Sequence, residues 1–79
     1  MRERVRALIA DVFGLAPAEV GDDASPDTIP SWDSLHHLEL MMGLELEFGV
    51  KVSTEDVPEL LSLEAIEEYL RDRGVAEAA

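Results

Sequence analysis

Three side chains near the middle of the sequence have the types that catalysis uses: Ser34, His36 and His37. A serine acts as a nucleophile where a base such as histidine lies within hydrogen-bond reach of its hydroxyl. On the helix predicted to begin at Ser34, the two histidines point about 100° apart and neither turns back to the serine. Helical metal ligands need a spacing of three or four residues, which this pair lacks. We therefore predict no catalytic residues and no metal site, with His37 at the edge of the core and His36 in solvent.

Ser34 lies where a long loop meets the start of a helix. Serine is common at such positions because its hydroxyl can cap the first backbone N–H groups of the helix. The same free N–H groups, together with the positive end of the helix dipole, also favour a phosphate attached there. Position alone favours the capping role.

The helix that positions Ser34 is predicted over residues 34–48, with Asp33 or Ser31 as its cap and Gly49 at its end. Two apolar stripes run along it. The first is typical of a core face and consists of Leu40, Met41, Leu44 and Phe48. The second, which we call the outer stripe, consists of Leu35, Leu38, Met42 and Leu46, with Glu39 and Glu45 beside it. Because a helix in a small bundle is hardly buried on all sides, we expect the outer stripe to be exposed and to bind other proteins. The alternative is that the last helix or the long loop covers part of it.

The rest of the chain also reads as helices and loops. A first amphipathic helix ends at Gly14, and a long connection over 15–33, with a short turn near 16–20, is anchored by Leu15, Val20 and Ile29. A brief or irregular third helix is expected from about Ser53 to Leu60 or Leu61, since Pro58 lies inside it. Ser62 caps a last helix that closes at Gly74. We predict an all-α fold: a small four-helix bundle with a long loop between helices 1 and 2 and a short third helix. It forms one domain over 1–79, folded over about 2–74, with a frayed tail over 75–79.

Charge and composition restrict the partners. The chain of 79 residues has 18 acidic and six basic residues, and its net charge is −12. Such a field repels nucleic acid and anionic membranes and accelerates encounters with basic proteins. There is no cysteine, so disulfides and thiolate metal sites are excluded. No apolar run approaches the roughly 20 residues that span a bilayer. We expect a soluble, cytoplasmic monomer that binds neither nucleic acid nor membranes.

The residues around Ser34 resemble a known family. The run Trp32-Asp33-Ser34-Leu35-His36-His37-Leu38-Glu39-Leu40-Met41-Met42 resembles the Asp-Ser-Leu signature and second helix of acyl carrier proteins. The likeness continues through Glu45, Glu47, Phe48-Gly49-Val50 and the acidic turn from Ser53 to Asp56, and it covers residues 3–73. The resemblance implies that Ser34 receives 4′-phosphopantetheine from coenzyme A and that Asp33 helps to position the transferase and its metal. It also implies that partner enzymes recognise Leu35, Leu38, Glu39, Met42, Glu45 and Leu46.

What the resemblance implies is a free-standing carrier, not an enzyme. Acyl intermediates would be held as thioesters on the covalent phosphopantetheine, which must supply the thiol in a chain without cysteine. The expected partners are a phosphopantetheinyl transferase and loading ligases, ketosynthases or acyltransferases with basic docking patches, in fatty acid, polyketide or another pathway. Ser31-Trp32, His36 and Leu46 depart from the pattern of fatty acid synthesis carriers and favour a specialised pathway. The alternatives are an aminoacyl or peptidyl carrier and an unmodified acidic helical adaptor.

Overall fold

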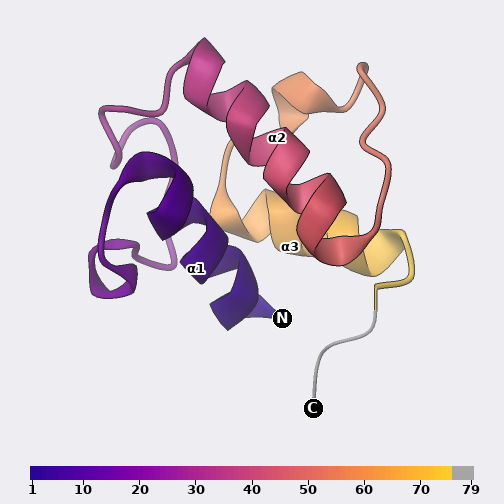
Figure 1. Ribbon diagram of the computed structural model, residues 1–79, viewed down its shortest axis with the longest axis horizontal. Coiled ribbons are helices and arrows are strands. Elements are labelled where there is room, and N and C mark those ends of the chain that lie inside the picture. The colour runs from indigo at the N-terminus through magenta and orange to yellow at the C-terminus, as the bar shows by residue number, and fades with distance from the viewer. Residues whose placement is uncertain (76–79) are drawn as a thin grey trace.

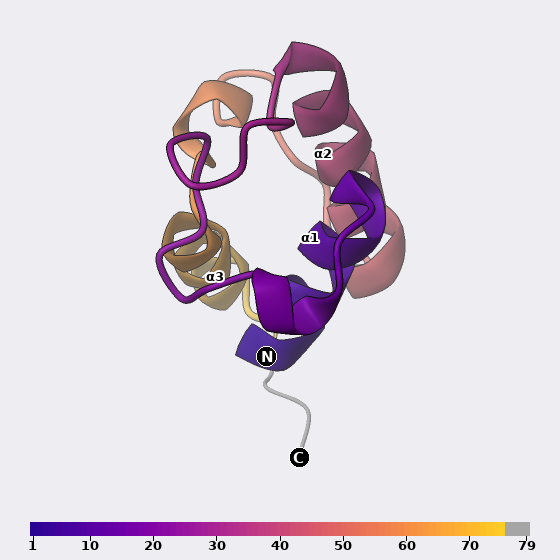
Figure 2. The ribbon, with the colours of Figure 1, turned by 90° about the vertical axis from the view of Figure 1, so that its left-hand side faces the viewer.

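The computed structural model describes residues 1–75, which contain helices and no strand (Figure 1). Three α-helices and two short 3-10 helices follow one another along the chain: α1 (Arg2–Phe13), η1 (Pro17–Glu19), α2 (Ser34–Phe48), η2 (Val57–Glu59) and α3 (Leu63–Asp72). Helix α1 packs against both α2 and α3. Figure 2 shows the connection from α1 to α2 running along one side of the bundle before it rises to the start of α2. Within residues 1–75, no helix is both long enough and apolar enough to cross a membrane.

Local signals in the sequence place the ends of the three α-helices. Gly14 and Gly49 follow α1 and α2 with φ angles of 68° and 66°, the left-handed conformation that glycine adopts without strain. The side chains of Asp33 and Ser62 accept hydrogen bonds from the third backbone N–H of α2 and of α3. These predicted ends are confirmed, as is the turn near residue 17, which is η1. Of the predicted frayed tail, residues 76–79 lie outside the described residues.

The predicted bundle of four helices is wrong in one respect: the third predicted helix is not an α-helix. Residues 53–61 hold only a turn and the three-residue 3-10 helix η2. Pro58 is the second residue of η2, and its ring would clash with the carbonyl four residues earlier in a longer α-helix. Asp56 does not cap this segment with its side chain. Its carboxylate instead accepts hydrogen bonds from Tyr69 and Arg73 on α3.

The core is built from one face of each α-helix and from the long connection. The fully buried side chains at its centre come from all three helices: Val5, Ile9, Leu40, Leu44, Leu63, Ile66 and Leu70. The connection contributes Val20, Ala24, Ile29 and Trp32, all at most 6% exposed, while Leu15 is partly buried. The predicted anchors of the loop are therefore confirmed. Burial of these side chains fixes the loop that leads to Ser34, since apolar burial is the main favourable term in folding.

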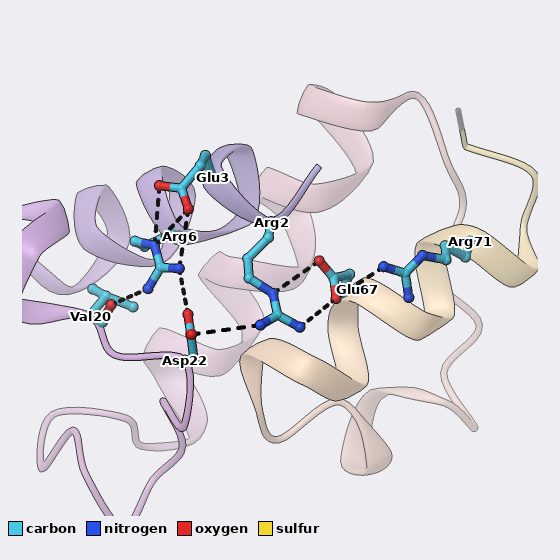
Figure 3. A network of polar contacts seen from close by, with 7 residues as sticks. All are labelled: Arg2, Glu3, Arg6, Val20, Asp22, Glu67 and Arg71. Carbon is cyan, nitrogen blue, oxygen red and sulfur yellow. Dashed lines mark hydrogen bonds and ion pairs between the residues drawn. The ribbon is translucent and has the colours of Figure 1, made fainter. Parts of the chain in front are cut away.

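All three arginines at the start of α1 have partners inside the molecule, and Figure 3 shows those of Arg2 and Arg6. Nε and Nη2 of Arg2 donate to the two carboxylate oxygens of Glu67, at 3.2 and 2.8 Å, and Glu67 is 3% exposed. These bonds hold the pKa of Glu67 below its ordinary value. Arg6 binds Asp22 and the carbonyl of Val20 on the connection. The cluster therefore ties the first two turns of α1 to α3 and to the long connection.

The third of these arginines lies at the other side of α1. Arg4 binds the carboxylate of Glu47 at 3.2 Å, and its guanidinium lies 4.5 Å from the centre of the Phe48 ring. Both residues belong to the last turn of α2. All three arginines therefore have carboxylate partners within the fold, although their position near the positive end of the α1 dipole is unfavourable.

Candidate functional site

The hydroxyl of Ser34 stands exposed at the first residue of α2. It has no hydrogen-bond partner in the described part of the chain, so it does not cap the helix; Asp33 does that. The backbone N–H groups of Ser34 and Leu35 are also without a partner among residues 1–75. Free N–H groups at a helix N-terminus form a favourable position for an anion. The site therefore combines an accessible hydroxyl with donors suited to a phosphate.

Asp33 is bound to the helix that it caps. Its Oδ1 accepts the backbone N–H of His36 at 2.9 Å and lies 2.8 Å from Nδ1 of the same residue. These hydrogen bonds lower the pKa of Asp33 because they favour its charged form. His36 also stacks on the ring of Phe13, with 5.6 Å between ring centres. The prediction of His36 in solvent is thus wrong in part, since its ring is half-buried between Phe13 and Asp33.

An open groove of about 470 Å³ adjoins Ser34. Its lining comes from the start of α2 and from the segment around η2: Trp32, Asp33, Ser34, His37, Leu38, Val57, Pro58 and Leu61. Sequence reasoning missed the three residues of the η2 wall. The sequence signal was the adjacent pair Leu60 and Leu61 in a short segment that cannot bury both. In the structure Leu60 is 3% exposed and Leu61 43%. An apolar residue that a short irregular segment leaves exposed is a candidate for a binding surface.

A chain of hydrogen bonds crosses the floor of the groove. Nε1 of Trp32 donates to Nδ1 of His37 at 3.0 Å, and Nε2 of His37 lies 2.7 Å from the carbonyl oxygen of Val57. Because Nδ1 accepts the indole N–H, the neutral ring carries its proton on Nε2 and donates it to Val57. Trp32 and His37 are 6% and 7% exposed. The prediction of His37 at the edge of the core is confirmed.

Helix α3 holds the other side of η2. The hydroxyl of Tyr69 donates to Oδ2 of Asp56 at 2.8 Å, and Nη2 of Arg73 lies 3.0 Å from the same oxygen. Burial and the hydrogen bond to Asp56 both raise the pKa of Tyr69. Asp56 directly precedes Val57. The wall of the groove is thus fixed from α2 through His37 and from α3 through Tyr69 and Arg73.

The outer stripe of α2 is exposed, as the sequence predicted. The exposed fractions of its residues are 65% for Leu35, 54% for Leu38, 62% for Met42 and 86% for Leu46. No other helix or loop covers it within residues 1–75. An exposed apolar row beside acidic residues is typical of a protein-binding surface. Its use by partner enzymes stays a prediction.

The two acids expected beside this stripe differ in their surroundings. Glu39 is exposed and has no partner within the described residues. Glu45 is half-buried, and its Oε2 accepts the backbone N–H of Val52 at 2.8 Å. Glu45 therefore closes the turn that follows α2. Its predicted contact with partners remains open, but a substitution there would also disturb the fold.

Comparison with known proteins identifies the family. The family model for the phosphopantetheine attachment site matches residues 3–70. The acyl carrier protein of Thermosynechococcus vestitus (strain NIES-2133 / IAM M-273 / BP-1) is 32% identical over 74 residues, which cover 94% of this chain and 91% of that protein. These matches place the chain in the acyl carrier protein family, whose members are non-enzymatic carriers with covalently attached phosphopantetheine.

Proposed function

We propose that Ser34 is the residue that bears the 4′-phosphopantetheine and that the protein delivers acyl groups to the enzymes of a biosynthetic pathway. The observation that carries the assignment is the free, exposed hydroxyl of Ser34 at the first turn of α2, at the rim of the groove. Attached there, a phosphate would lie beside the free N–H groups of Ser34 and Leu35. When bound, the group supplies the thiol on which an acyl group is held as a thioester.

The attachment itself needs a separate transferase. A bond would form between Oγ of Ser34 and the phosphorus of the pantetheine arm, while the pyrophosphate bond of coenzyme A would break and release adenosine 3′,5′-bisphosphate, and a base would take the serine proton. Both ring nitrogens of His37 are engaged by Trp32 and Val57, and the ring of His36 is turned to Asp33 and Phe13, so within the described residues neither histidine is hydrogen-bonded to the hydroxyl of Ser34. The residues of this chain present the hydroxyl, and the transferase must supply the base. Asp33, next to Ser34 and held in its charged form, is placed to help position the transferase and its metal.

The partners we propose share one surface chemistry. The outer stripe and Leu61 offer an apolar strip that passes the rim of the groove, and Glu39 adds a free negative charge. A transferase, a loading ligase, a ketosynthase or an acyltransferase with a basic patch around an apolar hollow would fit this strip. Proteins that bind each other through charged contacts of this kind associate fast and reversibly. Ser31-Trp32, His36 and Leu46, which depart from the pattern of fatty acid synthesis carriers, support partners of a specialised pathway.

Intact-mass spectrometry tests the assignment of Ser34. The protein is incubated with coenzyme A and a broad-specificity phosphopantetheinyl transferase, and a mass increase of one phosphopantetheine is expected. Ser34→Ala should show none, while Ser31→Ala, the matched control at a nearby exposed serine, should be modified like the wild type. Circular dichroism checks that Ser34→Ala is folded, which we expect because the hydroxyl has no contact to lose. An unmodified wild type would instead favour the acidic adaptor.

A further inference from the structure

One of the two carboxylate oxygens of Asp33 is engaged twice by a single neighbour. Oδ1 accepts the backbone N–H of His36 at 2.9 Å and lies 2.8 Å from Nδ1 of the same residue. Within residues 1–75, Oδ2 has no hydrogen-bond partner on another residue. The side chain of Asp33 is 61% exposed, and it lines the groove together with Ser34. The carboxylate therefore holds one oxygen to the helix and leaves the other open to a partner.

The bond from the His36 ring is not part of an ordinary helix cap. A capping aspartate needs only the backbone N–H at position 36, which any residue other than proline would donate. The second bond exists because position 36 holds a ring nitrogen, and Nδ1 must carry a proton to bind a carboxylate oxygen. His36 is also one of the residues that depart from the pattern of fatty acid synthesis carriers. The side chain at this position thus adds a hold on Asp33 that the cap does not require.

The ring of His36 is itself fixed against the core. It stacks on the ring of Phe13 of α1, with 5.6 Å between ring centres and 29° between ring planes. Phe13 is 8% exposed and lies against Trp32, with 5.2 Å between ring centres. Only 34% of the His36 side chain is exposed. The orientation of the exposed Asp33 carboxylate is thereby tied to the core of the bundle through His36.

We propose that His36 is a positioning residue for the modification of Ser34, because its Nδ1–H holds the Asp33 carboxylate in the orientation that the transferase meets. This inference rests on the proposed attachment at Ser34 and on the role proposed there for Asp33. Held by the cap bond alone, an exposed carboxylate could exchange its oxygens or turn into solvent. Ordering such a side chain when a partner docks weakens the encounter by roughly two- to tenfold. His36 avoids this loss because it orders the carboxylate in advance.

Two variants of His36 separate the donor from the ring. His36→Phe keeps a ring that can stack on Phe13 and lacks the donor. In His36→Asn the side-chain amide nitrogen lies about where Nδ1 does, so it can still donate to Asp33, while the ring is lost. Initial rates of modification with coenzyme A and a broad-specificity phosphopantetheinyl transferase, read from intact mass, give kcat/KM for each folded protein. Should His36→Phe not fold, His36→Ala, which also lacks the donor, takes its place.

We expect His36→Phe to be modified roughly two- to tenfold more slowly than the wild type, and His36→Asn to recover most of the rate. Equal rates for His36→Phe and the wild type would overturn the proposal. So would a His36→Asn variant that is as slow as His36→Phe, because the stacking and not the donor would then be what matters.

A double-mutant cycle shows whether His36 acts through Asp33. Asp33→Asn keeps an acceptor for the helix cap and removes the carboxylate that His36 is proposed to orient. In that slower background, followed over hours, His36→Phe should change the rate by less than about twofold. The full effect of His36→Phe in both backgrounds would mean that His36 acts on the transferase directly or through the fold, which contradicts the proposal.

Nitrogen NMR of the histidine rings tests the contact without the transferase. At about pH 9, above the range in which histidine usually titrates, the spectrum reports which ring nitrogen carries the proton. The ring whose signals vanish in His36→Phe should carry its proton on Nδ1 in the wild type and shift it toward Nε2 in Asp33→Ala. A proton on Nε2 of His36 in the wild type would contradict the proposal. A wild type that gains no mass with the transferase is a different result, which counts against Ser34 as the attachment site.

Discussion

Nε2 of His37 donates a hydrogen bond of 2.7 Å to the carbonyl oxygen of Val57, and this bond joins α2 to η2 across the groove beside Ser34. The same imidazole accepts the indole N–H of Trp32 on its other nitrogen, so one buried side chain satisfies partners from the long connection and from η2. No buried side-chain nitrogen or oxygen among the described residues is left without a partner. The groove is therefore part of the folded framework, held open by the same contacts that hold the fold together.

Replacing His37 with phenylalanine should destabilise the protein. The ring volume is roughly kept, but the buried Trp32 N–H and the Val57 carbonyl lose their partner, at a cost of about 1–3 kcal/mol. Urea denaturation followed by circular dichroism measures the loss. The matched variant His36→Phe keeps the stacking on Phe13 and loses only one half-exposed side-chain hydrogen bond, the one to Asp33, so its loss of stability should be clearly smaller. Equal losses in the two variants would contradict the central role of His37.

Stability should fall at acid pH in a way that depends on Glu67. Hydrogen bonds from Arg2 hold the pKa of Glu67 below its ordinary value of 4.5 in the folded protein. Such a carboxyl stabilises the fold above its unfolded pKa, and the contribution is lost as the pH falls through the folded pKa. Glu67→Gln should therefore be less stable than the wild type at neutral pH, and the difference should shrink below about pH 4.5.

Urea midpoints measured from neutral pH down to about pH 3 give this difference directly. The comparison between variants is needed because protonation also relieves the repulsion of a chain with a net charge of −12. Glu68→Gln, at the exposed neighbouring position, changes the net charge equally and should follow the wild type at every pH. A gap for Glu67→Gln that is the same at all pH values would argue against the ion pair with Arg2.

Much of the helical framework could be predicted because its signals are local. Gly14 and Gly49 end helices through their own backbone conformation, and Asp33 and Ser62 cap helices through N–H groups three residues away. The outer stripe could also be predicted, since helical periodicity alone shows that one helix has two apolar faces. The family resemblance then directed attention to Ser34.

The polar contacts that shape the site could not be predicted in the same way. Arg2 and Glu67 are 65 residues apart in the sequence. The pattern of apolar positions predicts which helix faces are buried, but it does not reveal which polar side chains meet. Periodicity likewise treats His37 as a residue at the border of the core, without showing that it joins Trp32 to Val57. The prediction for residues 53–61 is wrong because the capping pattern at Ser53 does not start an α-helix. Pro58 prevents a longer helix, and the side chain of Asp56 binds Tyr69 on α3.

Gly43 lets α1 approach α2 closely. A Cβ atom added there would lie 2.9 Å from Cδ1 of Leu8, which is half-buried. Gly43→Ala gains about 1 kcal/mol of helix propensity but forces Leu8 to another rotamer, so the net change should be near zero. In a Leu8→Ala background the same substitution should show nearly the whole gain, and urea denaturation of the four proteins measures this coupling. Equal effects in both backgrounds would mean that Leu8 does not limit position 43.

The negative charge of Glu39 should accelerate modification of Ser34 by a transferase with a basic docking patch. Glu39 is the acid of choice because Glu45 also binds the backbone of Val52, so that its reversal would alter the fold. Glu39→Lys should slow the modification several-fold at low salt and far less at about 1 M salt, where the screening length is only about 3 Å. Initial rates from intact mass at the two salt concentrations measure the effect.

The control for this prediction must change the charge of the whole protein equally. Asp11→Lys does so from an exposed position on α1, outside the outer stripe and the groove. If long-range attraction by the net charge drives the encounter, both variants will be slowed alike. If the partner docks on the outer stripe, Glu39→Lys will lose more than Asp11→Lys at low salt, and the two will converge as salt is added. The two rates are expected to converge because salt screens the charge at position 39, so that its effect on the rate of modification is lost.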